Sequence, residues 1–317
     1  MAYSPFYITP EELAVYQEAQ EQEILTGDNL TTWHKYDVEE PFRYHYKLTA
    51  LPFVIAPFLM VFFIHTSDTV GATIFAFILS VMMAGVFYLT IGLDYRYDYI
   101  FSDKGFVMKK RRNMPKWVNT ATQAVGWIGA VVCVVMVALV GPMALAGAGA
   151  FILLSFGMLK RQPDEPTEVR VGEREDWLFA DYNKKRKVLQ FYFKYDRCEY
   201  QDTAQEIVFR SQDRFDCYVF FKTEADLESM VAQLSKVYKL NCTEVEDHKK
   251  LFEAKPESRL FSIPVCSREY KTDEVFDLRA SKAPLPECKY LYDGKWQTES
   301  EIERLKAAGE QETTPAS

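Results

Sequence analysis

The sequence lacks the short motifs that mark common enzyme classes. It has no glycine-rich phosphate loop, no G-x-S-x-G nucleophile motif, no H-E-x-x-H zinc motif and no cysteine pair at C-x-x-C spacing. Its four histidines are not spaced as metal ligands with one another or with a cysteine cluster: His34, His45, His65 and His248. We therefore predict no catalytic residue, no metal site and no cofactor, and a protein that is not an enzyme.

Charge is missing from three long stretches. Residues 48–67, 69–93 and 117–159 contain no Asp, Glu, Lys or Arg. A membrane-spanning helix needs about 20 mostly apolar residues, so the first two stretches predict one span each. The third is long enough for two spans, with Gly141 and Pro142 as the break between them. The alternative, a set of buried helices in a soluble core, fits less well because such helices are usually shorter.

The sequence also lacks a positively charged, then apolar, start of the kind a signal peptide has. Lys and Arg concentrate in the loop 94–116, whereas residues 65–68 and 141–142 have none. Because basic loops stay on the cytoplasmic side, both termini are predicted to be cytoplasmic. The expected location is a bacterial inner membrane. Cys133 then lies in the membrane and the other five cysteines in the reducing cytoplasm, so we expect no disulfide framework.

Local patterns predict the parts of the chain outside the spans. Thr9, Pro10 and Glu12 form a helix start with a capping box. Residues 97–108 alternate as a β-hairpin, and an isolated hairpin is barely stable, so we expect it to join one sheet with the strands of 167–221. Thr223 begins an amphipathic helix that ends near residue 238. A further strand is expected at 259–265, a hairpin at 289–297, and a capped helix after Thr298.

The predicted fold class is thus an α+β membrane protein, with four transmembrane helices in two hairpins and a mainly antiparallel β domain ending in an amphipathic helix. Its parts, in chain order, are an N-terminal segment with a capped helix (1–47), transmembrane hairpin 1 (48–93), a basic loop with a β-hairpin (94–116), transmembrane hairpin 2 (117–159), a cytoplasmic β domain with a helix (160–240), a C-terminal extension (241–308) and a disordered tail (309–317).

Two segments carry a resemblance to a known family. They are YDYIFSDKGFVMKKRR, just after a predicted helix pair, and DCYVFFKTEADLESMVAQL, where a strand meets a helix. In these the chain resembles the bacterial membrane-anchored pleckstrin-homology-like (YcxB-like) proteins, over about a third of its length. The resemblance implies a PH-like cytoplasmic domain. The chain departs from the simpler pattern by the second helix pair and by the residues after the capped helix.

Two basic clusters are the candidate binding residues. We interpret them as a surface that contacts anionic lipid headgroups, where each basic residue contributes about 1 kcal/mol of binding free energy. The alternatives are a topology determinant for the first cluster and a solvated turn for the second. The clusters are Lys109, Lys110, Arg111 and Arg112, and Lys184, Lys185, Arg186 and Lys187.

Small residues in the last predicted helix pair allow close helix packing, either within the hairpin or between subunits. They are Gly126, Ala130, Ala144, Gly147 and Ala148.

These observations favour a non-enzymatic membrane scaffold or sensor, in an accessory role in a system such as secretion, conjugation or phage defence. The expected partners are the lipid bilayer and a cytoplasmic or membrane protein, with homo-oligomerisation open. Nucleic acid is not expected, since the C-terminal part, residues 160–317, has 27 basic and 32 acidic residues and a net charge of −5. The alternative function is a channel or membrane-transport component. It is disfavoured because the central thirds of the predicted spans hold no ionisable residue.

Overall fold

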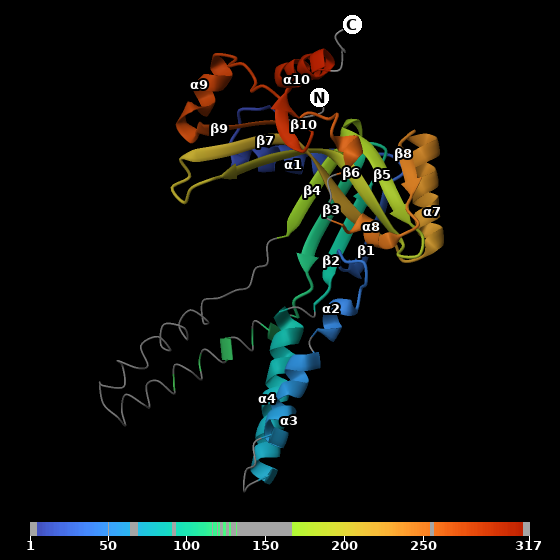
Figure 1. The fold of residues 1–317 in the computed structure, drawn as a ribbon, viewed down its shortest axis with the longest axis vertical. Coiled ribbons are helices and arrows are strands. Elements are labelled where there is room, and N and C mark those ends of the chain that lie inside the picture. The colour runs from blue at the N-terminus through green and yellow to red at the C-terminus, as the bar shows by residue number, and fades with distance from the viewer. Residues whose placement is uncertain are drawn as a thin grey trace, which may run out of the picture. The chain divides into compact units, whose positions relative to one another are not determined.

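The computed structural model describes residues 5–49, 51–63, 69–90, 93–115, 167–253 and 257–312, with scattered positions between 117 and 131. The chain divides into two compact units. The first comprises residues 1–41, 97–109 and 169–317, and the second comprises residues 42–96 and 110–168. Figure 1 shows the elements of both.

A four-stranded sheet brings together strands that are distant in the sequence. Its order is β1-β2-β3-β4, with β1 at Thr31–Asp37, β2 at Tyr95–Phe101, β3 at Gly105–Arg112 and β4 at Glu168–Glu173. β2 and β3 form the predicted hairpin, closed by a bond from the Ser102 amide to the Gly105 carbonyl at 3.0 Å. β1 pairs with one side of the hairpin and β4 with the other. These strands supply the stability that an isolated hairpin lacks.

A five-stranded sheet has the order β8-β5-β6-β7-β9. Its long central strands, β6 (Val188–Tyr200) and β7 (Ile207–Phe220), pair antiparallel along their whole length. β5 (Trp177–Asn183) and β9 (Cys266–Lys271) add antiparallel on either side, and β8 (Asn241–Glu244) runs parallel to β5. The prediction that the hairpin joins one sheet with the strands of 167–221 is confirmed for β4, which pairs with β3. It is wrong for β5, β6 and β7, which form a second sheet.

The two sheets share one hydrophobic core. Tyr97, Tyr99 and Phe101 alternate along β2 and point into it, opposite Phe191 and Phe193 of β6. The Tyr97 ring meets Phe220 of β7 edge-on, and Phe106 of β3 meets Phe191 of β6 edge-on, a geometry that aromatic pairs prefer. The buried Tyr99 hydroxyl donates to the Tyr218 carbonyl at 2.8 Å and accepts from the Phe220 amide at 3.2 Å.

A capped helix covers one end of this core. α7 (Glu224–Ala232) begins at Thr223, whose side chain and backbone form a capping box with Asp226. It continues as a π-helical turn, η2 (Gln233–Val237). Leu227, Met230 and Leu234 are buried in the core. The predicted helix is thus confirmed in its start, its apolar stripe and its approximate end.

The N-terminal segment packs against the far ends of β6 and β7. α1 (Pro10–Leu25) starts with the expected capping box between Thr9 and Glu12. Before it, Phe6 and Tyr7 share a small core with Val208 and Tyr270.

The C-terminal part is built from short elements. α8 (His248–Leu251), η3 (Ser258–Leu260), η4 (Thr272–Glu274) and α9 (Val275–Ala280) precede the hairpin of β10 (Lys289–Tyr292) and β11 (Lys295–Thr298), and α10 (Glu299–Glu312) follows it. The predicted hairpin and the Thr298 cap are confirmed. The strand expected at 259–265 is wrong, since that region holds η3 and the strand begins at Cys266.

A disulfide joins Cys266 and Cys288, so the prediction that the chain has none is wrong. That prediction followed from the assumed cytoplasmic location alone. The two cysteines lie 22 residues apart in the chain, and the antiparallel bridge between Val265 and Lys289 brings their backbones together.

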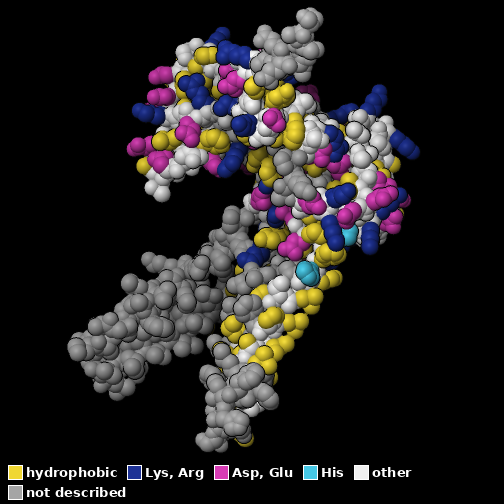
Figure 2. Space-filling view, viewed as in Figure 1, with side chains coloured by type: hydrophobic (Ala, Val, Ile, Leu, Met, Phe, Trp, Pro, Cys, Tyr) yellow, Lys and Arg dark blue, Asp and Glu magenta, His cyan; other side chains and the backbone are white. Residues whose placement is uncertain are grey.

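The second unit contains α2 (His45–Leu48), α3 (Leu51–Phe63) and α4 (Thr69–Thr90). Asp94 forms ion pairs at 3.0 Å with both Arg43 and Lys47. The α3 and α4 helices contact each other, and Ser80 of α4 donates to the Val54 carbonyl of α3 at 2.8 Å. Hydrophobic side chains remain exposed on both helices (Figure 2).

No helix within the described ranges is both long enough and apolar enough to cross a membrane. The described part of α3 has 13 residues, against about 20 for a span. The predicted α+β membrane fold with four transmembrane helices is therefore wrong, and with it the integral inner-membrane location with cytoplasmic termini. A stretch of 20 residues without charged side chains does not by itself establish an apolar helix of that length.

Most of the second predicted transmembrane hairpin, 117–159, lies outside the described residues. The same holds for the helix-packing residues proposed on it, Gly126, Ala130, Ala144, Gly147 and Ala148.

Candidate partner-binding groove

The basic turn 184–187 connects β5 to β6, and its side chains pair with acids. Arg186 donates to both carboxylate oxygens of Asp37, at 2.6 and 3.2 Å, and to the Val38 carbonyl at 3.1 Å. The two side chains are only 12% and 3% exposed, so this is a buried structural pair. Lys184 lies 2.9 Å from Glu228, and this bond raises the pKa of Lys184. Lys185 is exposed and Lys187 half-buried.

The other basic cluster forms the C-terminal end of β3. Lys109 forms an ion pair with Glu21 of α1 at 2.5 Å, and the Lys110 ammonium lies 4.9 Å from the centre of the Tyr95 ring. Arg111 and Arg112 end the strand and also have interaction partners. Since Lys109, Lys184 and Arg186 have acidic partners within the protein, a structural role accounts for them. Lipid contact by the eight residues stays a prediction from the sequence.

A groove of about 550 Å³ opens on the first unit. β6 and β7 form its floor, and β4 and the segment around α8 and η3 contribute further lining residues. Four carboxylates and one guanidinium line it: Glu39, Asp216, Glu253, Glu257 and Arg170. Its other lining residues include Gln190, Tyr192, Phe215, Tyr218, Phe252 and Leu260.

Strand alternation produces the floor. Gln190 and Tyr192 of β6 lie opposite Tyr218 and Asp216 of β7, so all four occupy one face of the sheet. Gln190 donates to the Asp216 carboxylate at 2.7 Å. Burial raises the pKa of Asp216, and the Gln190 bond opposes that rise. The floor therefore presents a partly desolvated carboxylate between two aromatic rings.

The segment after α8 forms one wall and is fixed to the sheet by aromatic and ionic contacts. Phe252 stacks on Tyr218 with ring centres 4.8 Å apart, and the Tyr218 hydroxyl donates to the Leu251 carbonyl at 2.7 Å. Arg259 binds Glu257 at 2.8 Å and also pairs with Asp181 of β5. These contacts hold the Glu257 carboxylate at the groove, and the Arg259 bond lowers its pKa.

Two further contacts position Arg170, Phe215 and Glu39 in the groove lining. The Arg170 guanidinium lies 3.5 Å from the centre of the Phe215 ring, a close cation–π contact. Tyr97 donates from its hydroxyl to Glu39 at 3.2 Å. The groove thus combines excess negative charge with aromatic surface, which suits a basic protein segment better than an anionic or purely apolar ligand.

Sequence reasoning did not find this groove. Its lining residues run from Glu39 to Leu260 and come together only through the pairing of two sheets. Gln190 and Tyr192 are separated by the apolar Phe191, and Asp216 and Tyr218 by Cys217. This spacing was the local signal that one face of the two strands carries polar groups. In the described ranges no group of His, Cys, Asp and Glu side chains is placed to hold a metal ion.

Comparison with known proteins corrects the family. The sequence profile described as TsiV2 immunity protein matches residues 17–255, which is most of the chain. The curated immunity protein TsiV2 of Vibrio cholerae serotype O1 is 36% identical over 70 residues, 22% of this chain and 29% of that protein. The match therefore spans less than a third of the length of this relative. No solved structure matches.

These findings replace the YcxB-like resemblance, which rested on segments without a specific motif and is wrong. They support the coarser part of the predicted function, namely an accessory, non-enzymatic role with a protein partner. They do not support a membrane scaffold, a lipid bilayer partner, or the alternative of a channel or transport component. Because the profile covers residues 17–255, the chain belongs to the TsiV2 immunity protein family.

Proposed function

We propose that this protein neutralises a toxin protein by binding it directly, and that the acidic groove receives a basic segment of that toxin. The family supports a toxin as the partner. The observation that supports the surface is the groove itself, with four carboxylates against one guanidinium on an aromatic floor.

The proposed mechanism is stoichiometric binding. Charge of one sign in a concave surface attracts an oppositely charged segment and speeds its association. Aromatic rings such as Tyr192 and Tyr218 then supply contact area of the kind that dominates interface energies. A bound toxin is blocked from its target for as long as the complex lasts, so a slow dissociation rate matters most for protection.

Protection can be measured directly in cells. A strain of the source organism that lacks this chain should lose viability when it is mixed with its toxin-producing parent, and the wild-type chain should restore survival. Glu253→Lys combined with Asp216→Asn should restore it poorly, because these changes remove two of the four groove carboxylates and add a base. The expected loss of affinity for the purified toxin is about tenfold or more.

The matched control is Glu269→Lys, which reverses an exposed acid on β9, outside the groove lining. It changes the net charge by two units, as Glu253→Lys alone does, against three units for the double groove variant, and it should protect like the wild type. Equal protection by the groove variant and the control would exclude the groove as the toxin site. Failure of the wild-type chain itself to restore survival would exclude the immunity function.

A further inference from the structure

The disulfide lies at the junction between the five-stranded sheet and the C-terminal hairpin. Cys266 is the first residue of β9, and Cys288 directly precedes β10. Both are half-buried rather than enclosed in the core, so a small thiol has access to the bond. We call residues 289–312, which contain β10, β11 and α10, the C-terminal module.

Few noncovalent contacts are described between the C-terminal module and the sheet at this junction. Val265 and Lys289 exchange two backbone hydrogen bonds, each 2.8 Å long. The Arg214 guanidinium lies 4.8 Å from the centre of the Trp296 ring. The module meanwhile exposes large hydrophobic side chains, with Trp296 48% and Leu305 50% exposed. The disulfide is therefore a major tether of the module to the sheet.

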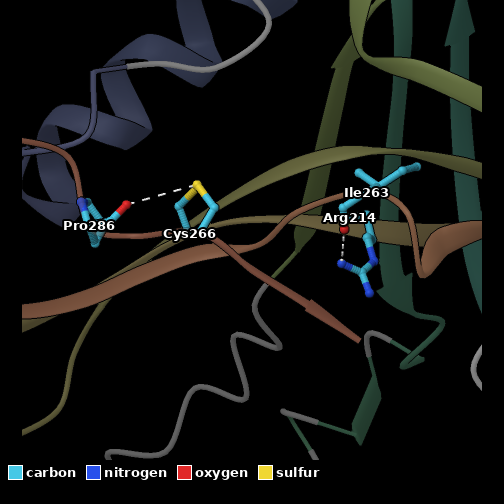
Figure 3. The surroundings of a disulfide bond; sticks show 5 residues. Arg214, Ile263, Cys266 and Pro286 are labelled. Carbon is cyan, nitrogen blue, oxygen red and sulfur yellow. Dashed lines mark hydrogen bonds between the residues drawn. A yellow bond between two sulfur atoms is a disulfide. The ribbon is translucent and has the colours of Figure 1, made fainter. Parts of the chain in front are cut away.

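The same junction continues into the groove. Leu260 lines the groove, and three residues later the Ile263 carbonyl accepts a hydrogen bond from Arg214. Figure 3 shows this bond close to the disulfide. Arg214 precedes Phe215, which also lines the groove and carries the Arg170 contact. The segment 260–266, seven residues long, thus connects one wall of the groove to the disulfide.

We infer that the Cys266–Cys288 disulfide is a redox-sensitive tether that sets the wall of the toxin-binding groove, so that the oxidised chain binds its partner and the reduced chain binds it less well. This inference rests on the proposed function. A dithiol breaks the S–S bond by delivering two electrons and two protons. It leaves two protein thiols and closes to its own disulfide. Without the cross-link, the module and the segment 261–266 gain conformational freedom.

Hydrogen exchange tests the tether without any toxin. In the full-length oxidised chain, the amides of Val265 and Lys289 should exchange slowly, because both are hydrogen-bonded. After treatment with dithiothreitol, or in Cys266→Ser combined with Cys288→Ser, their exchange and that of residues 258–263 should accelerate about tenfold or more. Cys198→Ser is the control, since Cys198 has no disulfide and the new hydroxyl can still donate to the Ile8 carbonyl.

Protection assays then separate this inference from the function on which it rests. If the wild type protects cells, the double serine variant should protect at least severalfold less, while Cys198→Ser should match the wild type. Unchanged exchange at residues 258–263 after reduction would overturn the tether. Full protection by the double variant would show that the tether does not regulate binding. Loss of protection by the wild type would instead remove the proposed function and leave the exchange result standing.

Discussion

Arg210 is fully buried, and each of its three guanidinium nitrogens has a partner. It donates to the carbonyls of Phe6, Arg197 and Ser211 at 3.1, 3.1 and 3.2 Å. It also forms an ion pair with Asp196 at 2.9 Å. Through Phe6 it holds the N-terminal segment on the β6–β7 pair. A planar cation with five donors suits this arrangement, and lysine could not replace it.

Arg210→Ala should lower the free energy of unfolding by about 3–5 kcal/mol, because it leaves Asp196 and several carbonyls without their buried cation. Urea denaturation followed by circular dichroism would measure this. Arg197→Gln is the comparison, since the exposed Arg197–Glu199 pair should contribute less than about 1 kcal/mol. Similar losses in the two variants would show that Arg210 is not a structural anchor.

Asp176 makes the protein sensitive to high pH. It is 6% exposed, and its Oδ1 has no hydrogen-bond partner in the structure. Burial, followed by repulsion from Glu173, raises its pKa from 3.8 to about 8, against the attraction of Lys194. The unfolded chain therefore releases this proton at lower pH than the folded one, and folding loses free energy as pH rises from about 4 to about 8.

Asp176→Asn removes this ionisation and should raise the free energy of unfolding at pH 8.5 by a few kcal/mol, with little effect at pH 4. Thermal unfolding across this pH range would show it. Asp202→Asn should act in the opposite direction, because backbone hydrogen bonds from Ile207 and Glu206 lower the pKa of Asp202. Its stabilising effect is present at neutral pH and lost as pH falls. An Asp176→Asn variant whose advantage does not grow with pH would contradict the assignment.

For single residues, the helix caps were predictable from the sequence, whereas the burial of charged side chains was not. The caps at Thr9, Thr223 and Thr298 follow from residues within three positions of one another, and all three are confirmed. Arg210 and Asp176 look like ordinary surface charges in the sequence. Their burial comes from segments far away in the chain, such as the N-terminal residues that cover Arg210.

Among the elements, hairpins and capped helices were predictable because their signals are short. β1 has no clear strand signal in the sequence, since Trp33 and Tyr36 fit a membrane boundary as well as a strand. In the structure, the Trp33 indole donates to the Phe220 carbonyl at 3.1 Å and its ring stacks on Phe221. β9 was placed seven residues too early, because nothing local marks where it meets the edge of β7.

The approach of β3 to β4 depends on a glycine. A Cβ on Gly105 would lie 2.7 Å from the Gly172 carbonyl oxygen and 2.7 Å from the Ile24 Cδ1 atom. The carbonyl cannot move without disturbing β4. Gly105→Ala should therefore lower the free energy of unfolding by about 1–3 kcal/mol, as measured by urea denaturation.

Gly85 in α4 provides the matched control. A Cβ there meets no atom of the described residues within 4 Å. Alanine also has a higher helix propensity than glycine, so Gly85→Ala should be neutral or stabilise the helix by up to about 1 kcal/mol. Equal stability of the Gly105→Ala variant and the wild type would mean that the two strands can separate slightly without cost.

For the molecule as a whole, hydropathy was the misleading signal. Charge-free runs such as 48–67 suggested spans, but no helix within the described ranges is both long enough and apolar enough to cross a membrane. The partner-binding groove was out of reach for a different reason, since it requires the order of two sheets that no local pattern encodes. A net charge of −8 favours basic partners and argues against nucleic acid.

That charge leads to a prediction about association with the toxin. Both the net charge and the groove carboxylates should steer a basic segment, and such steering is screened over about 8–10 Å at physiological salt. The association rate constant, measured by stopped-flow fluorescence, should fall about tenfold or more between 0.05 and 0.5 M NaCl, while the dissociation rate constant changes little. Glu253→Lys should reduce this salt dependence more than Glu269→Lys, although both change the net charge equally, because only Glu253 lines the groove. An equal reduction in the two variants would assign the steering to net charge alone, and a rate constant independent of salt would show that the toxin segment in the complex is not basic.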